Sequence, residues 1–307
     1  MRHLSPSHEG FLEEPGAMRP ALLMCAPSLY AVDYVINPWM DGNVGTCSQA
    51  RAMIQWHRLY NLLAQFAQVH LIEPAPGSPD MVFTANAGLI RDDQAVLSSF
   101  LHPERQGEEP HFRRWFEEAG YTVLPLPREL AFEGEGDALF SADGEHLWVG
   151  FGTRTMETSH AAVASALQVR VEGLRLVDPR FYHLDTCFAP LADGSLLYYP
   201  QAFDGRSREA IESYYSPEQR IAVSEADALC FACNAVNLGS TVVMNHTSNE
   251  LKTALERRGF HVLQTALDEF LKAGGAAKCL VLKLAPHRHT PQFCFDTPRY
   301  NTSACNA

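Results

Sequence analysis

The sequence predicts an α/β fold in which about five copies of a small unit close around a common centre. The first observation is a recurring helix, short break and apolar strand, found in residues 49–74, 113–127, 161–179 and 249–267. The second is a β-hairpin pattern after each of these stretches, in residues 81–100, 136–150, 185–200 and 233–245. A unit of this size cannot bury its apolar face alone, so neighbouring copies are expected to pack on one another.

The spacing of apolar residues and the glycines at helix ends support the helical half of the unit. In residues 49–69, apolar side chains recur at the spacing of one helix face, at Trp56, Leu59, Leu63 and Phe66. Gly120 and Gly259 stand where a glycine ends a helix. We therefore expect outer helices, each followed by a strand.

Turn residues support the hairpin half. The dipeptides Asp143-Gly144 and Asp193-Gly194 lie between apolar runs, as in a tight hairpin. The last copy is shortened to residues 279–286, and the opening strand, residues 20–27, is expected to supply a fifth copy of the strand alone.

Composition limits the function classes. The chain has 307 residues, 46% hydrophobic and 20% charged, with a formal net charge of -12. An acidic chain is a poor partner for nucleic acid, whereas an acidic pocket attracts a small cation. No apolar run is long enough for a membrane span.

The ends of the chain differ from its middle. Residues 1–18 form a polar leader without the apolar region of a signal peptide, and residues 286–307 form a tail without clear periodicity. We expect a single catalytic domain over residues 19–285. The eight cysteines show no disulfide-scaffold spacing, which favours reduced thiols and a cytoplasmic protein.

Polar residues come directly before each hairpin. They are Asp80, Glu133 with Asp137, His183 with Asp185, Asn234, and Cys279. Equivalent positions of a closed array converge on its axis, so these side chains are expected to meet in one pocket. The pair His183 and Asp185, two residues apart, would point to one face if the segment is a strand.

This set of side chains suits one kind of chemistry. A Cys, a His and a carboxylate make a nucleophilic site, in which the thiolate attacks and the imidazole moves a proton. Further carboxylates suit a planar cation with several N–H donors, and a guanidinium is such a cation. Its positive charge would also favour the thiolate form of Cys279.

The motifs PDMVFTANAG, FEGEGDALF, GFGTRT, HLDTCF and GGAAKCLVLKL occur in this order over nearly the whole chain. Together they resemble the guanidino-group-modifying superfamily, also called penteins or amidinotransferases. The resemblance implies a five-bladed α/β propeller that uses neither a metal nor an organic cofactor. It also implies a small-molecule substrate such as arginine, and it leaves room for self-association into a homo-oligomer.

The resemblance implies a role for each matching residue. Cys279 would attack the guanidinium carbon, and His183 would protonate the leaving amine and then activate water. Glu133 would pair with the histidine or the guanidinium, although FEGEGD is one residue longer than the usual motif, so Glu135 competes for this role. Asp80 and Asp185 would hold substrate nitrogens, with Asn234 and Asp137 nearby, and Arg154 would bind an α-carboxylate.

Asn86 departs from the acid that deiminases and dimethylargininases tend to carry near this position. An amide both donates and accepts hydrogen bonds, so it could also hold a neutral ureido group. FTANA and FEGxGD look most like arginine dihydrolases, which convert arginine to ornithine, carbon dioxide and two ammonia. A deiminase or dimethylargininase yielding citrulline, an amidinotransferase and a non-catalytic arginine-binding module remain as alternatives.

Other motifs have plainer interpretations. Cys230 and Cys233 form a CxxC motif, which we expect to be core cysteines in a strand that leads to Asn234 rather than a redox or zinc site. His287 and His289 look like part of a metal site, but a solvated tail is the simpler interpretation. The segment 31–46, with two glycines, is the predicted mobile lid.

Plainer roles also remain open for the site candidates. Asn86 could cap a turn, and Asp80 and Asp137 could serve local backbone bonding. Arg154 could be a surface charge, and His183 could be a structural histidine.

Overall fold

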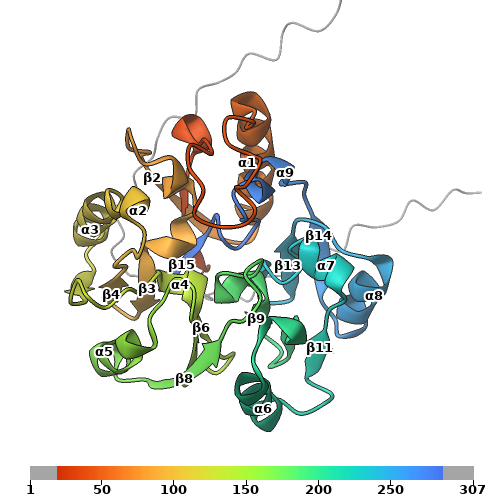
Figure 1. The fold of residues 1–307 in the computed structure, drawn as a ribbon. Coiled ribbons are helices and arrows are strands. Elements are labelled where there is room, and N and C mark those ends of the chain that lie inside the picture. The colour runs from red at the N-terminus through yellow and green to blue at the C-terminus, as the bar shows by residue number, and fades with distance from the viewer. Residues whose placement is uncertain (1–18, 286–307) are drawn as a thin grey trace, which may run out of the picture.

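The computed structural model describes residues 19–285. These residues form five three-stranded sheets arranged around a common centre (Figure 1). The leader, the tail and with them His287 and His289 lie outside the described residues. Over residues 19–285, no helix is both long and apolar enough to cross a membrane.

Each sheet repeats one topology. Its first strand pairs antiparallel with its second, and the second pairs parallel with the third. Four sheets follow the chain order: β3 (Gly88–Arg91), β4 (Gln94–Leu97) and β5 (Thr122–Pro125); β6 (Ala138–Phe140), β7 (His146–Phe151) and β8 (Arg170–Arg175); β9 (Phe188–Pro190), β10 (Leu196–Tyr198) and β11 (Arg220–Ala222); β12 (Val236–Leu238), β13 (Thr241–Met244) and β14 (His261–Gln264).

One longer helix connects the second and third strand of every sheet and lies at the periphery of the ring (Figure 1). These helices are α1 (Gln49–Leu63), α3 (Glu109–Glu118), α5 (His160–Leu167), α6 (Gly205–Tyr214) and α8 (Asn249–Arg257). The shorter ones are α2 (Pro103–Gln106), α4 (Gly134–Asp137), α7 (Glu225–Leu229) and α9 (Asp268–Leu271). Gly120 and Gly259 follow α3 and α8 with φ of 87° and 88°, as predicted for helix-ending glycines.

The fifth sheet joins the two ends of the described chain. β15 (Leu282–Leu284) pairs antiparallel with β1 (Ala21–Cys25), and β1 pairs parallel with β2 (Gln68–Ile72). The expectation that the opening strand copies the strand after the helix is therefore wrong, because β1 takes the second position of its sheet. The last hairpin is short in sequence because its other arm comes from β1.

The helix–strand pair that the sequence patterns missed is α6 with β11. Its helix segment, GRSREAIESY, buries only Ser207 and Ile211. One buried aliphatic side chain leaves a weak apolar stripe, so helical periodicity is hard to detect there.

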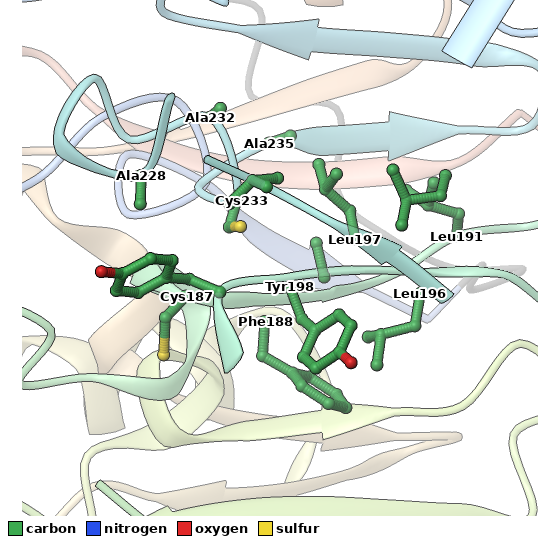
Figure 2. Close-up of a cluster of buried hydrophobic side chains, with 14 of the residues drawn as sticks. Cys187, Phe188, Leu191, Leu196, Leu197, Tyr198, Ala228, Ala232, Cys233 and Ala235 are labelled. Carbon is green, nitrogen blue, oxygen red and sulfur yellow. The ribbon is translucent and has the colours of Figure 1, made fainter. Parts of the chain in front are cut away.

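The apolar core lies between neighbouring sheets. Its largest cluster joins β7, β9, β10 and the residues after α7, with Trp148 5.5 Å from Phe188 between ring centroids. Figure 2 shows Cys187 and Cys233 among the apolar side chains of this cluster. Cys230 and Cys233 follow helix α7 in a turn rather than a strand, which corrects the expected context, and both are free thiols.

Short helical turns lead into the first strands of the sheets and carry the polar residues. They include 3-10 turns at Pro79–Val82, Thr84–Ala87 and Leu184–Thr186, together with α4. α4 packs against the turns at Thr84–Ala87 and Leu184–Thr186, which brings three sheets together at the centre. The strand expected around His183 begins only at Phe188, so the pair His183 and Asp185 lies on a turn.

Candidate active site

Cys279 lies in a turn just before β15 and is only 2% exposed. Its Sγ accepts a hydrogen bond of 3.1 Å from Asn234 Nδ2 and lies 3.4 Å from Asp185 Oδ2. Asn234 Oδ1 in turn accepts the backbone N–H of Cys279 at 3.1 Å. The thiol is therefore held by residues that come from two other sheets.

Burial controls the protonation of this group. Burial and the neighbouring Asp185 carboxylate raise the pKa of the Cys279 thiol well above its ordinary value. Burial also raises the pKa of Asp185 to about 7, although Lys278 and the thiol itself lower it. Without a ligand the sulfur is thus a thiol, and a cation placed beside it would favour thiolate.

His183 and Glu133 form the second part of the site. His183 Nε2 and Glu133 Oε2 share a hydrogen bond of 2.7 Å, and Arg154 Nη1 donates to the same carboxylate oxygen at 3.1 Å. Burial alone would raise the pKa of Glu133, but Arg154 and His183 hold this pKa well below its usual range. A permanently ionised Glu133 can orient the imidazole and stabilise its protonated form.

Glu135 points elsewhere. Its Oε2 accepts 2.8 Å and 3.0 Å hydrogen bonds from Lys278 Nζ and the backbone N–H of Lys283. The Lys278 side chain is 5% exposed, so this is a buried ion pair directly beside Cys279 in sequence. Of the two candidate acids, the structure places Glu133 at the histidine.

Asn86 is held by a buried arginine that the sequence analysis did not select. Arg105 Nη1 donates to Asn86 Oδ1 at 2.8 Å. The same guanidinium forms a two-point ion pair with Glu108, with both distances 2.8 Å, and Arg105 is 3% exposed. Sequence patterns did not reveal it because Arg105 stands in HPERQGEEP, which resembles a solvated charged loop.

Asp80 and Asp137 are both buried but face different surroundings. Asp80 Oδ2 accepts the Tyr34 hydroxyl at 2.9 Å, while its Oδ1 is buried without a hydrogen-bond partner. Burial raises the pKa of Asp80, against the lowering effect of Arg105. Asp137 Oδ1 accepts the backbone N–H of Leu184 at 3.0 Å. Asp137 thus supports the turn that carries His183 and Asp185, and it does not line the pocket described next.

A small pocket, with a cavity volume of about 10 Å³, lies against these residues. Of the predicted site residues, those that line it are Asp80, Asn86, Arg154 and Cys279. Arg105, Tyr182 and Phe83 complete its polar and aromatic wall. The other predicted site residues lie behind this wall. Asp185 and Asn234 contact Cys279 directly. Glu133 contacts Arg154, and His183 is linked to Arg154 through Glu133.

The segment 31–46 closes one side of the pocket. Tyr34 bonds Asp80, Asn37 Nδ2 donates to the Ala273 carbonyl at 2.9 Å, and Arg154 Nη2 donates to the Ile36 carbonyl at 2.9 Å. Trp39 Nε1 donates to the Arg180 carbonyl at 2.7 Å. The segment therefore covers the site, and its mobility stays a prediction.

Within residues 19–285, no group of three or more His, Cys, Asp or Glu side chains could hold a metal ion. The polar atoms of the pocket suit a ligand with both a cationic and an anionic end, because the Asp80 carboxylate and two guanidinium groups line it together.

Comparison with known proteins identifies the family. Residues 31–285 match the model of the eukaryotic N,N dimethylarginine dimethylhydrolase family. The chain belongs to this family. The resemblance to the guanidino-group-modifying superfamily and the five-bladed propeller fold are both confirmed.

Several curated relatives cover the same part of the chain. The bifunctional arginine dihydrolase/ornithine cyclodeaminase AgrE of Nostoc sp. is 58% identical over 266 residues, which are 87% of this chain and 38% of that protein. ArgZ of Synechocystis sp., with the same two named activities, is 56% identical over 86% of this chain and 37% of its own length. The N(G),N(G)-dimethylarginine dimethylaminohydrolase of Mycobacterium tuberculosis is 40% identical over 86% of this chain and 85% of that protein. The chain thus spans well under half the length of the two bifunctional relatives.

Solved structures agree with the fold. The N-terminal domain of ArgZ, an arginine dihydrolase from the ornithine-ammonia cycle in cyanobacteria, was crystallised as a Cys-to-Ser mutant bound to substrate. It matches with a TM-score of 0.86 at 56% identity, covering 86% of this chain and 97% of that chain. Unliganded AgrE matches with a TM-score of 0.87 at 57% identity, covering 89% of this chain and 41% of that chain.

Proposed function

We propose that residues 19–285 form one catalytic domain that hydrolyses arginine to ornithine, carbon dioxide and two ammonia, with Cys279 as the nucleophile. The observation that carries this proposal is the position of Cys279. Its sulfur contacts Asp185 and Asn234 at a pocket lined by a carboxylate, two guanidinium groups and the Asn86 amide. The high identity to arginine dihydrolases supports the choice of reaction.

Binding of the substrate cation prepares the nucleophile. The substrate guanidinium would donate to Asp185, and the unpartnered Oδ1 of Asp80 is free to accept another substrate N–H. A positive charge beside Cys279 stabilises the thiolate, so the thiol loses its proton when the substrate is present. In this scheme the carboxylates both hold the substrate and select for a cation.

The first hydrolysis then uses two proton transfers at His183. The Cys279 thiolate attacks the guanidinium carbon, the C–N bond to one terminal nitrogen breaks, and His183 supplies the proton that lets ammonia leave. His183 next takes a proton from water, which attacks the thiouronium carbon and releases citrulline and the thiolate. Glu133 holds the imidazole through the 2.7 Å hydrogen bond during both transfers.

The second hydrolysis repeats the attack on the ureido carbon of bound citrulline. A second ammonia leaves, water releases the carbamate of ornithine, and this carbamate loses carbon dioxide. A ureido group is neutral and carries an oxygen acceptor, so an amide donor is better suited to it than a further carboxylate. Asn86 supplies such a donor at the pocket wall.

The two pocket arginines suit the other end of the substrate. Arg105 and Arg154 are both buried, and Arg154 Nε has no hydrogen-bond partner. A buried guanidinium with a free N–H suits a carboxylate, as in the α-carboxylate of an amino acid. Agmatine, which lacks this group, should therefore be a poor substrate.

Product analysis tests this function. Purified protein is incubated with arginine, with Cys279→Ala as the control, and ornithine, citrulline and ammonia are measured. Ornithine with two ammonia per arginine supports the proposal. Citrulline with one ammonia refutes the second hydrolysis and leaves a deiminase. Ornithine formation by Cys279→Ala would exclude Cys279 as the nucleophile.

A second candidate is hydrolysis of dimethylarginine to citrulline. The matching family model and the relative from Mycobacterium tuberculosis favour it. The same assay distinguishes the two functions when dimethylarginine is supplied, because this reaction releases dimethylamine rather than ammonia. We place either reaction in the cytoplasm, because the six cysteines of residues 19–285 are free thiols.

A further inference from the structure

The orientation of the Asn86 amide is fixed from both sides. The Arg105 guanidinium can only donate, so the atom 2.8 Å from it must be the amide oxygen. The amide nitrogen faces the Glu133 carbonyl oxygen at 3.4 Å, which can only accept. Reversing the amide would place a donor against a donor and an oxygen against an oxygen.

A glycine leaves the space that the amide nitrogen occupies. Gly136 lies in α4, and a side-chain Cβ added there would fall well inside contact distance of Asn86 Nδ2. The same Cβ would lie 3.4 Å from His183 Cγ. The amide nitrogen and the imidazole therefore face the same gap from two sides. Asn86 cannot retreat from a new side chain without losing the hydrogen bond from Arg105.

We infer that Gly136 and Arg105 act as positioning residues that hold the Asn86 amide nitrogen toward the reacting group, and that this position determines whether the second hydrolysis proceeds. The inference rests on the proposed dihydrolase function and deepens it. Asn86 is close to the nucleophile, because the backbone N–H of the adjacent Ala85 donates to the Cys279 carbonyl at 3.1 Å.

The two substrates differ in what they offer to this amide nitrogen. A guanidinium carries only N–H donors, so an N–H on Asn86 can form no hydrogen bond with it. The ureido group of citrulline carries an oxygen, and negative charge develops on that oxygen when Cys279 attacks. The amide N–H therefore contributes mainly to the second round. A carboxylate at position 86 would instead set an oxygen against the Glu133 carbonyl oxygen.

The test compares Gly136→Ala with the wild type on both rounds. Conversion of supplied citrulline to ornithine should fall about 100-fold, because misplacing one donor to a developing oxyanion typically costs about 10²–10³ in rate. Conversion of arginine to citrulline should fall by less than about tenfold, so citrulline should accumulate. Gly205→Ala is the matched control, since a Cβ there would meet nothing within 4 Å.

A double-mutant cycle separates positioning from general damage. In an Asn86→Ala background, adding Gly136→Ala should change neither rate more than about twofold, because the displaced group is already absent. If Gly136→Ala alone does not fold, the double variant should fold again, as judged by its Tm. Loss of both rates in equal proportion, or the same loss in the Asn86→Ala background, would overturn the inference.

The products of the wild-type protein show whether the dihydrolase function or only the positioning role of Gly136 and Arg105 has failed. Wild-type protein that stops at citrulline overturns the dihydrolase function and the inference with it. Wild-type protein that makes ornithine, together with a Gly136→Ala variant of unchanged product ratio, overturns the inference alone.

Discussion

Glu133→Gln and Glu135→Gln form a matched pair of perturbations. Both glutamates are buried, are two residues apart, and pair with a buried cation: Arg154 at 3.1 Å and Lys278 at 2.8 Å. Removing one partner of a buried ion pair costs about 3–5 kcal/mol, and glutamine keeps the volume and a hydrogen-bonding oxygen. We expect each variant to lose about 3 kcal/mol of unfolding free energy.

The two variants should differ in catalysis. Glu133 also holds His183 through a 2.7 Å hydrogen bond, whereas Glu135 bonds Lys278 and the backbone of Lys283. A positioned acid–base group typically contributes about 10²–10⁴-fold. The kcat for ammonia release should therefore fall at least about 100-fold in Glu133→Gln and less than about tenfold in Glu135→Gln.

Urea unfolding measures the stability loss, and ammonia release at saturating arginine measures kcat under conditions where both variants are folded. The stability contributed by Glu133 should also depend on pH in a definite direction. The pKa of Glu133 is lower in the folded than in the unfolded protein, so its stabilisation is present above about pH 4.3 and is lost as the pH falls. The stability gap between wild type and Glu133→Gln should shrink in acid. Equal kcat losses in the two variants would refute the assignment of Glu133.

Three further predictions concern substrate binding and packing. Arginine should bind to Cys279→Ser, whose hydroxyl can keep a hydrogen bond to Asp185, more tightly as the pH rises through about 7, because Asp185 must lose its proton to hold the guanidinium. Calorimetry that shows flat affinity from pH 6 to 8 would contradict this. Gly274→Ala should lower Tm by several degrees, because Gly274 has φ of 82° and an added Cβ would lie 2.9 Å from the Tyr182 ring; an unchanged melting curve would exclude this strain. Leu22→Ala, at a fully buried position of β1, should cost about 2–5 kcal/mol in urea unfolding, and a loss below about 1 kcal/mol would argue against tight packing there.

Much of the fold could be predicted because it repeats. Hairpin turns and outer helices carry local signals, and the sequence analysis found four of the five helix–strand pairs. The exceptions have physical causes. β1 was misassigned because its pairing with β15 joins residues more than 250 positions apart, which no local pattern reveals. α6 was missed because it buries little apolar surface.

The site could be predicted for those residues that come just before the first strand of a sheet. Cys279, Asp185 and Asn234 do converge, and His183 does meet Glu133. The assumed strand at His183 was wrong, yet the helical turn also directs both side chains of that segment to the centre. Arg105, which lines the pocket, and Tyr34, which donates to Asp80, could not be predicted, because each lies in a connecting segment whose path depends on the packed fold.

The pairing of β1 with β15 also sets when the chain becomes chemically competent. Cys279 lies just before β15, and its sulfur rests on Asp185 and Asn234 from two other sheets. Any state in which β15 is not docked leaves the thiol without these neighbours. A chain emerging from the ribosome carries the acids, the histidine and the arginines long before Cys279 is in place. The surroundings of the Cys279 sulfur are thus assembled only when the ring closes, and under the proposed function incompletely made chains should be inactive.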